Sequence, residues 1–317
     1  MRGDDLVPLG RTGLTVSRLG LGLASIGGLF APVPERQAIA TVDHAWDLGV
    51  RLYDTAPVYG YGRSERYAGR SLAPRPREEF VLCTKVGRLI EPGGQDTQTI
   101  WADPPAGVGP RLDYSKAGVR RSVEASLERL GTDRIDVLHV HDPEQDFPAA
   151  VTDAYRALAD LRADGTIAAV SIGVNHADVA ARFLREAAAP GPDCVLLAGR
   201  YTLLDQSGLG ELLPLCHQRG VSVIAAGVYQ GGLLTRRDAP RVRAWRALCD
   251  RHDVPLPAAA LRFPFAHPAV DAAVVGARDP REIADSMAWL SHPVPPALWH
   301  DAKRTGLIPE QAPAATA

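Results

Sequence analysis

Residues 119–140 read VRRSVEASLERLGTDRIDVLHV and contain the unit from which this chain is built. Apolar residues recur every three to four positions from Val119 to Leu130, which predicts an amphipathic helix. Gly131 follows as the stop expected at a helix C-terminus. The largely apolar run at 135–140 is typical of a strand buried on both faces. This stretch therefore predicts a helix that leads into a buried parallel strand.

The same unit recurs along the chain. Residues 39–53, 154–172 and 209–225 each combine a helical apolar period, a glycine and a short apolar run. Alternating helices and strands predict βα units around a parallel sheet. Further strands are expected at residues 19–22, 80–84, 194–197 and 272–275. About eight strands in 317 residues predict an α/β fold of the (β/α)8 TIM-barrel type, because a doubly wound sheet would leave strands over.

The domain organisation follows from the lack of any Pro/Ser-rich linker between these units. We expect one barrel domain over residues 1–317. Residues 88–114, rich in Gly and Pro around a lone Trp101, are expected to form a long inserted loop. The stretch 291–317, rich in Pro and Ala, is expected to be a tail that packs loosely or frays.

Composition excludes several classes of function. A net charge of -2 without a basic block gives no reason to expect nucleic acid as a partner. No leader or membrane-spanning run is seen, and a cytoplasmic location is expected. The cysteines lack C-x-x-C spacing, which predicts buried free thiols and neither a disulfide framework nor a metal site. Oligomeric state is not indicated. The four cysteines are Cys83, Cys194, Cys216 and Cys249.

A TIM barrel carries its chemistry at the C-terminal ends of the strands. Asp54, Lys85, His141 and Asn175 each fall at or just past such an end, and Tyr59 follows Asp54 in DTAPVYG, residues 54–60. An ammonium that a carboxylate holds beside a phenol is expected to pull the pKa of the phenol down toward neutrality. Such a phenol can exchange a proton with a carbonyl or hydroxyl group.

Rarity strengthens two of these candidates. Lys85 is one of only three lysines, against 32 arginines, and a lysine is a compact charge with a tunable pKa. Asn175 is the single asparagine, and its carboxamide can pair with another planar amide, such as that of nicotinamide. The alternatives are accidents of composition, a surface tyrosine at Tyr59 and a turn histidine at His141. His139 shares a face with His141 but is expected to lie deeper.

These residues resemble the motifs of the aldo-keto reductases over nearly the full length. Residues 196–206 and the insertion around Trp101 are similar to the branch of L-fucose (D-threo-aldose) 1-dehydrogenases and pyridoxal 4-dehydrogenases. The motifs that carry the family resemblance are Tyr53-Asp54-Thr55-Ala56-x-x-Tyr59-Gly60 with Ser64-Glu65, Thr84-Lys85, Leu130-Gly131-x-Asp133-x-Ile135-Asp136, His141-x-Pro143 and Gly276-Ala277-Arg278.

The resemblance implies a catalytic tetrad. Tyr59 would be the general acid/base, Lys85 would lower its pKa, and Asp54 would hold Lys85. His141 would orient the substrate oxygen. The run GLGLAS at residues 20–25 lacks the third glycine of a Rossmann fingerprint, and we expect it to be the first barrel strand and its loop.

The resemblance also implies a nicotinamide nucleotide site. NADP is favoured, with NAD possible, because Arg278 can pair with a 2′-phosphate, although Asp279 beside it opposes that charge. Asn175 would hold the nicotinamide amide. Three positions depart from the commoner pattern: no serine precedes Asn175, Ala226 replaces a stacking aromatic, and Ala198 replaces a glutamine. The remaining cofactor candidates are Gln230, Gly231, Gly232 and Leu233 around the pyrophosphate, and Gly276, Arg278 and Glu282 near the adenosine.

The implied activity is hydride transfer between NAD(P) and C1 of an aldose, with the sugar oxidised to a lactone. A pyridoxal 4-dehydrogenase or a general aldehyde or ketone reductase is the alternative within the same chemistry. Two other classes stay open: a nicotinamide-nucleotide-sensing regulatory subunit, and a lyase that forms a Schiff base on Lys85. The expected partner is a small carbonyl or sugar substrate.

Overall fold

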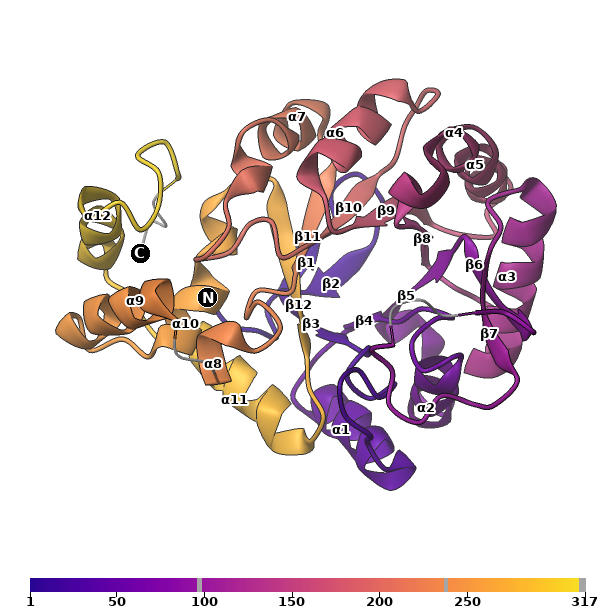
Figure 1. Cartoon of the computed structure of the whole chain (residues 1–317), viewed down its shortest axis with the longest axis horizontal. Helices are drawn as coiled ribbons and strands as arrows, with labels where there is room; N and C mark the ends of the chain where they lie inside the picture. The colour runs from indigo at the N-terminus through magenta and orange to yellow at the C-terminus, as the bar shows by residue number, and fades with distance from the viewer. Residues whose placement is uncertain (96–98, 237–238, 314–317) are drawn as a thin grey trace.

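The computed structural model describes residues 1–95, 99–236 and 239–313. Its centre is a closed barrel of parallel strands in which each strand pairs with the next one along the chain, and the last pairs with the first (Figure 1). This confirms the predicted TIM barrel and places residues 20–22 in its first strand. The barrel strands are β3 (Leu19–Gly22), β4 (Leu52–Asp54), β5 (Val81–Val86), β8 (Val137–His141), β9 (Ala169–Val174), β10 (Cys194–Ala198), β11 (Ser222–Ala226) and β12 (Val270–Gly276).

Helices surround the barrel on its outside (Figure 1). Gly131 and Gly220 end two of them with φ of 64°, the left-handed conformation that glycine adopts without strain. The helices are α1 (Glu35–Asp47), α2 (Arg63–Leu72), α3 (Lys116–Leu130), α4 (Phe147–Ala149), α5 (Tyr155–Ala163), α6 (Ala177–Glu186), α7 (Leu212–Arg219), α8 (Leu233–Arg236), α9 (Pro240–Arg251), α10 (Leu256–Arg262), α11 (Pro280–Ser291) and α12 (Pro296–Arg304).

A hairpin before the first barrel strand closes the N-terminal end of the barrel. It consists of β1 (Leu6–Pro8) and β2 (Thr15–Ser17), paired antiparallel. Leu9 and Val16 of the hairpin are fully buried in one apolar cluster with residues of seven barrel strands. The chemistry is therefore left to the opposite, C-terminal rim, as the fold predicts.

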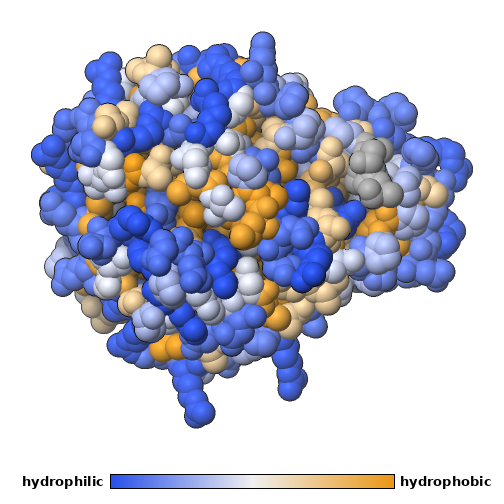
Figure 2. All heavy atoms as spheres, turned by 180° about the vertical axis from the view of Figure 1, so that it is seen from behind, coloured by the Kyte–Doolittle hydropathy of each residue, from blue (hydrophilic) through white to orange (hydrophobic). Residues whose placement is uncertain are grey.

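The outer surface is mainly polar. Seen from behind, charged and polar residues cover most of the outline, and apolar residues gather near the middle (Figure 2). The large apolar side chains that are exposed are Met1, Leu6, Phe30 and Leu112. Within the described ranges, no helix is long and apolar enough to cross a membrane.

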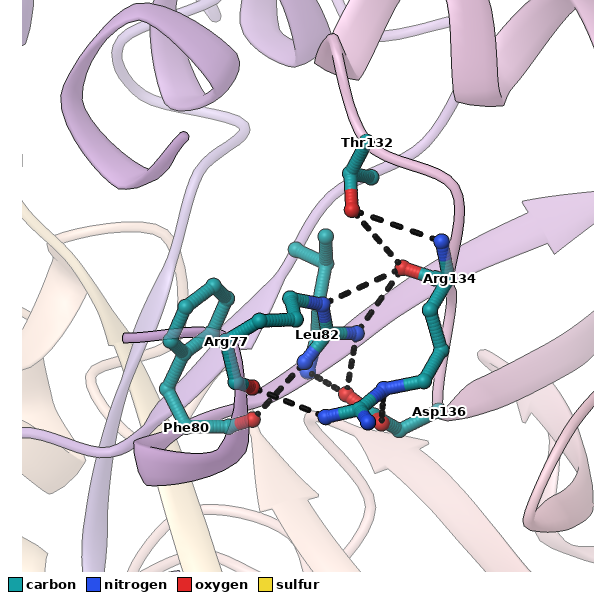
Figure 3. Close-up of polar contacts among 6 residues, drawn as sticks. All are labelled: Arg77, Phe80, Leu82, Thr132, Arg134 and Asp136. Atoms are coloured by element: carbon teal, nitrogen blue, oxygen red, sulfur yellow. Dashed lines mark hydrogen bonds and ion pairs between the residues drawn. The ribbon is translucent and has the colours of Figure 1, made fainter. Parts of the chain in front are cut away.

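Asp136 joins β5 to β8 near their N-terminal ends (Figure 3). Its Oδ2 accepts hydrogen bonds from the Leu82 N–H at 2.8 Å and from Arg77 Nη2 at 2.6 Å. Arg134 Nε lies 3.3 Å from its other oxygen. Arg77 also donates to the Phe80 carbonyl at 3.1 Å, and its guanidinium lies 4.7 Å from the Phe80 ring centroid. This cluster fixes the register of the two strands that carry Lys85 and His141.

The segment 88–114 is not the long loop that its composition suggests. It contains an antiparallel hairpin of β6 (Arg88–Pro92) and β7 (Val108–Leu112). Gly94 and Gly109 bring the two backbones so close that a Cβ on Gly109 would lie 2.3 Å from the Gly94 oxygen. Gly94 and Gly109 are therefore required by a close approach of two backbone segments. Residues 96–98 lie outside the described part.

The expectation of a loose tail after Ser291 is wrong for the described residues up to 313. Pro296 starts α12, where its missing N–H is not needed. Leu298 and Trp299 are buried, as are Ile308 and Ala312 beyond the helix. Figure 1 places α12 near α9, on the side of the barrel away from the β6–β7 hairpin. Apolar residues at helical spacing outweighed the proline-rich composition. Residues 314–317 lie outside the described part.

Candidate active site

Three strand ends and one loop bring the predicted tetrad together. Asp54 ends β4, Lys85 lies one residue before the end of β5, and His141 ends β8. Lys85 Nζ donates to Asp54 Oδ1 and Oδ2 at 2.8 and 2.7 Å and to the Thr55 carbonyl at 2.8 Å. Both charged side chains are buried, with Lys85 1% exposed and Asp54 4%. The ammonium is thus held in one position by three oxygens.

Tyr59 lies in the loop between β4 and α2, beside this ion pair. Lys85 Nζ is 4.9 Å from the centroid of the Tyr59 ring, and the His141 ring centroid is 6.1 Å away, nearly perpendicular. Gly60 allows the loop to take this path: its φ is 60°, and a Cβ there would lie 2.1 Å from the Gly27 oxygen. The four side chains predicted from sequence therefore meet at one rim.

The pKa of Tyr59 differs from the expectation. Burial raises the pKa of the phenol, and the charge of Lys85 lowers it again but only in part, so the net direction is upward. The predicted net lowering of the Tyr59 pKa is therefore wrong in this structure, because sequence patterns carry no information on desolvation. At neutral pH the phenol is protonated and able to donate.

The two histidines of β8 are neutral and occupy different depths. Burial lowers the pKa of both rings, that of His141 well below its usual value. His139 is fully buried, as its position predicted, and its Nε2 lies 3.2 Å from Asp54 Oδ1. Burial raises the pKa of Asp54, but Lys85 and His139 together hold it below its ordinary value. Sequence reasoning missed the contact of His139 with Asp54; its signal is the two-residue spacing to His141.

An apolar wall stands over the phenol. The Trp101 ring lies 5.4 Å from the Tyr59 ring at an interplanar angle of 35°. Trp101 pairs with Leu29 in an isolated antiparallel bridge, so the loop after β3 and the β6–β7 hairpin meet above the site. Ala56, Val58 and Trp101 form one buried cluster. The indole Nε1 of Trp101 is buried and has no hydrogen-bond partner among the described residues.

Asn175 follows β9 directly and lies exposed at the same rim. Its Nδ2 donates to Asp142 Oδ1 at 3.0 Å, and its carbonyl accepts from Arg200 Nε at 2.5 Å. The single carboxamide predicted to hold a nicotinamide amide is therefore fixed at both its side chain and its main chain.

The loop from Gln230 to Leu233 has a left-handed backbone. Gln230, Gly231 and Gly232 have φ of 51°, 62° and 86°. The Gln230 side chain is used elsewhere, donating to the Gly199 carbonyl at 2.8 Å and to Thr202 Oγ1 at 2.9 Å. The N–H groups of Gly232 and Leu233 donate to carbonyls of the turn. A pyrophosphate would have to share these two N–H donors with the turn carbonyls. The space next to Gly231 is open, so a bound group could approach the backbone there.

The candidate adenosine residues lie together after β12. The Arg278 N–H donates to Glu282 Oε2 at 2.8 Å, and Arg278 Nη2 donates to the Leu29 carbonyl at 3.1 Å. Arg278 Nε is buried without a hydrogen-bond partner in the described chain. Asp279 caps α11, where its Oδ1 accepts from the Arg281 and Glu282 N–H groups. Gly276 ends β12 where a Cβ would lie 2.5 Å from Ser25 Oγ.

A family model described as the aldo/keto reductase family matches residues 18–303. The chain belongs to this family. It is 38% identical to the D-threo-aldose 1-dehydrogenase of a Pseudomonas species, across 94% of this chain and 96% of that protein. It is 40% identical to the pyridoxal 4-dehydrogenase of Microbacterium luteolum, across 97% and 99%. The structure of a glycerol dehydrogenase of Gluconobacter oxydans has a TM-score of 0.76 at 24% identity, covering 99% of each chain.

These matches make the protein an NAD(P)-dependent oxidoreductase that acts on a small carbonyl or aldose substrate. The residues of this aldo/keto reductase fit a nicotinamide dinucleotide: an exposed, fixed carboxamide at Asn175, open space at Gly231 and a buried, unpartnered nitrogen on Arg278. No group of three or more potential metal ligands occurs among the described residues. All four cysteines are free and buried, as predicted.

Two features of this aldo/keto reductase were not found from sequence. Asp142, the acceptor for Asn175, has no sequence signal beyond its place directly after His141. A hollow of about 750 Å³ lies between α2, α3 and the β6–β7 hairpin, lined in part by Tyr61, Ile90 and Arg129. None of the four tetrad side chains lines it, so it is separate from the site.

Proposed function

We propose that this aldo/keto reductase transfers hydride between a nicotinamide nucleotide and C1 of an aldose, with Tyr59 as the general acid/base. The observation that carries the proposal is the buried Lys85 ammonium, bonded to Asp54 and 4.9 Å from the Tyr59 ring. The similarity to a D-threo-aldose 1-dehydrogenase supports an aldose as the substrate. NADP is favoured over NAD as the cofactor. The Asp279 carboxylate accepts hydrogen bonds from two N–H groups of α11, which partly offset its negative charge and leave Arg278 better able to pair with a 2′-phosphate.

A bound nicotinamide supplies or accepts the hydride. In aldose oxidation, the fraction of Tyr59 that is ionised, which grows as the pH rises toward the raised pKa of the phenol, takes the proton of the C1 hydroxyl while the C1–H bond electrons leave with the hydride, and a cyclic sugar becomes a lactone. In reduction, the Tyr59 phenol gives its proton to the carbonyl oxygen. Lys85 stabilises the phenolate by its charge, and Asp54 keeps Lys85 in place. Neutral His141 donates a hydrogen bond to the substrate oxygen.

A pyridoxal 4-dehydrogenase is the second candidate, favoured by the 40% identity to such an enzyme. It would use the same four side chains on an aromatic aldehyde or its hydrate. A lyase that forms a Schiff base on Lys85 has less support. Burial lowers the pKa of Lys85, but Asp54 and Tyr59 raise it above its usual value, so the amine is protonated and cannot attack a carbonyl.

The test is Tyr59→Phe, measured by the absorbance of reduced nicotinamide at 340 nm with aldoses and pyridoxal as substrates. General acid–base catalysis contributes about a hundredfold to ten-thousandfold, so kcat should fall by that factor while nucleotide binding is kept. Tyr67→Phe on α2 is the matched control and should keep full activity. An unchanged kcat in Tyr59→Phe refutes the role of this phenol. A wild type that binds the nucleotide but turns over no substrate supports the sensing-subunit alternative.

A further inference from the structure

Asp142 occupies the tight turn that follows His141. It is 6% exposed and has a φ of 45°, a conformation that few residues other than glycine adopt but that Asp and Asn tolerate best. Its N–H donates to the Gly173 carbonyl at 2.9 Å, which ties the turn to the neighbouring strand β9. The Tyr114 hydroxyl donates to the carbonyl of Asp142 at 2.7 Å and to that of His141. The carboxylate is therefore held at one point of the rim.

The two oxygens of this carboxylate face two different parts of the site. Oδ2 accepts from Arg88 Nη2 at 2.6 Å, and both side chains of this ion pair are almost fully buried. Oδ1 accepts from Asn175 Nδ2 at 3.0 Å. Arg88 begins the β6–β7 hairpin whose loop carries Trp101 over Tyr59. Asp142 thus lies between the hairpin and the carboxamide.

The carboxylate also decides which way the Asn175 amide points. A carboxylate only accepts hydrogen bonds, so Nδ2 must face Asp142, and Oδ1 of Asn175 is left to accept from another amide. The side chain before it, Val174, offers no hydrogen-bonding group. Without Asp142 an exposed asparagine would be free to rotate and to reverse its amide.

We propose that Asp142 is a positioning residue that orients Asn175 for the amide of the nicotinamide and that Arg88 holds Asp142 for this task. The inference rests on the proposed function of the site. Hydrogen bonds then run from Arg88 of the β6–β7 hairpin through Asp142 to the Asn175 carboxamide, and so connect the substrate side of the site to the cofactor side. A change at Arg88 is therefore expected to reach the cofactor through Asp142 and Asn175.

The first test is Asp142→Asn, read out as the dissociation constant of NADPH and of NADH by quenching of protein fluorescence, without substrate. The asparagine tolerates the left-handed turn, so the backbone is preserved. Its side chain has one acceptor oxygen for two donors, so one contact is lost. Loss of a hydrogen bond involving a charged group weakens binding about tenfold or more. Asp153→Asn, an exposed acidic residue beyond the turn, is the control and should bind as the wild type does.

A double-mutant cycle separates orientation from general damage. If Asp142 acts through Asn175, then Asp142→Asn should weaken nucleotide binding no further once Asn175→Ala is present. Arg88→Met should weaken binding in the same direction, and Arg88→Lys should restore most of it because the positive charge returns. Thermal melts show that each variant is folded. If Asp142→Asn does not fold, the two Arg88 variants carry the test.

The outcomes are distinct from those that test the proposed function. A wild type that binds neither nucleotide contradicts the proposed function itself. A wild type that binds, with Asp142→Asn unchanged, contradicts only the role of Asp142. Additive effects of Asp142→Asn and Asn175→Ala overturn the coupling, as does failure of Arg88→Lys to recover affinity lost in Arg88→Met.

Discussion

The strands β5 and β8 carry a polar cluster at each end, and the two clusters are built differently. At the N-terminal end, Asp136 accepts short hydrogen bonds from Arg77 and the Leu82 N–H and forms an ion pair with Arg134 (Figure 3). At the C-terminal rim, Lys85 is equally well bonded, but His141 Nδ1 is buried with no hydrogen-bond partner among the described residues.

The contrast separates groups that stabilise from groups that react. Every polar atom that Asp136 brings into the interior meets a donor, as stability requires. At the rim, one nitrogen of His141 and the indole nitrogen of Trp101 are buried without a hydrogen-bond partner among the described residues. This costs stability unless a ligand supplies the hydrogen bond. The number of buried polar atoms with hydrogen-bond partners therefore differs between the stabilising end and the reactive end of these strands.

The largest effect is expected for Asp136→Ala, at the N-terminal cluster. Removing one partner of a largely buried ion pair, and leaving the Leu82 N–H unpaired, should lower the free energy of unfolding by about 3 kcal/mol. Urea unfolding measures this loss. The kcat of the folded fraction should stay as in the wild type. Asp133→Ala, at an exposed neighbour, is the control with a change within about 0.5 kcal/mol. A large loss of kcat without a loss of stability would show that Asp136 serves the reaction and not the stability of the fold.

The next effect concerns pH and belongs to the rim alone. Because the pKa of Tyr59 is raised, its phenol stays protonated beyond pH values of about 10, the ordinary pKa of tyrosine. Because the pKa of His141 is lowered, its ring is neutral at pH values above about 6.5. For carbonyl reduction, kcat/KM should therefore be flat from about pH 7 to 9. It should fall about tenfold per pH unit above the raised Tyr59 pKa, because the proton donor is then lost. An inflection between pH 7 and 9 that disappears in Tyr59→Phe would contradict this profile.

The smallest effect is expected for His139→Phe, which keeps a ring in the core but removes the nitrogen 3.2 Å from Asp54. Losing this polar neighbour of the Asp54 carboxylate should lower kcat about fivefold, equivalent to about 1 kcal/mol, because Asp54 is then less firmly fixed. Steady-state kinetics with saturating nucleotide measures it, and KM for the substrate should not change. A KM increase with unchanged kcat would show that His139 acts on binding instead.

Much of this molecule could be predicted because its signals are local. Helical periods, glycine stops and apolar runs predicted the barrel strands, and strand ends predicted Asp54, Lys85 and His141 as site candidates. The family resemblance joined them with Tyr59 in a tetrad. The β6–β7 hairpin and α12 do not follow from the same signals, because glycine and proline favour loops in general. Here Gly109 serves a close backbone approach and Pro296 a helix start.

The remaining site features depend on contacts between distant segments. Asp142 meets Arg88 across 54 residues of sequence and Asn175 across 33. Residue spacing along the sequence does not predict contacts between segments so far apart. The upward shift of the Tyr59 pKa likewise depends on burial, in a site where the Trp101 ring contacts the Tyr59 ring. Burial is a property of the assembled barrel and has no signature in residues 54–60.

The pairing of the first and last residues of the β6–β7 hairpin bears on how related sequences can diverge. Arg88 pairs directly with Leu112, so the chain leaves the barrel after β5 and returns to α3 at nearly the same point. Insertions or deletions between Pro92 and Val108 can therefore change the surface above Tyr59 without moving Lys85 or the start of α3. New substrate preferences can arise in this segment by exchange of one module, while the proton-transfer chemistry beneath it is inherited unchanged.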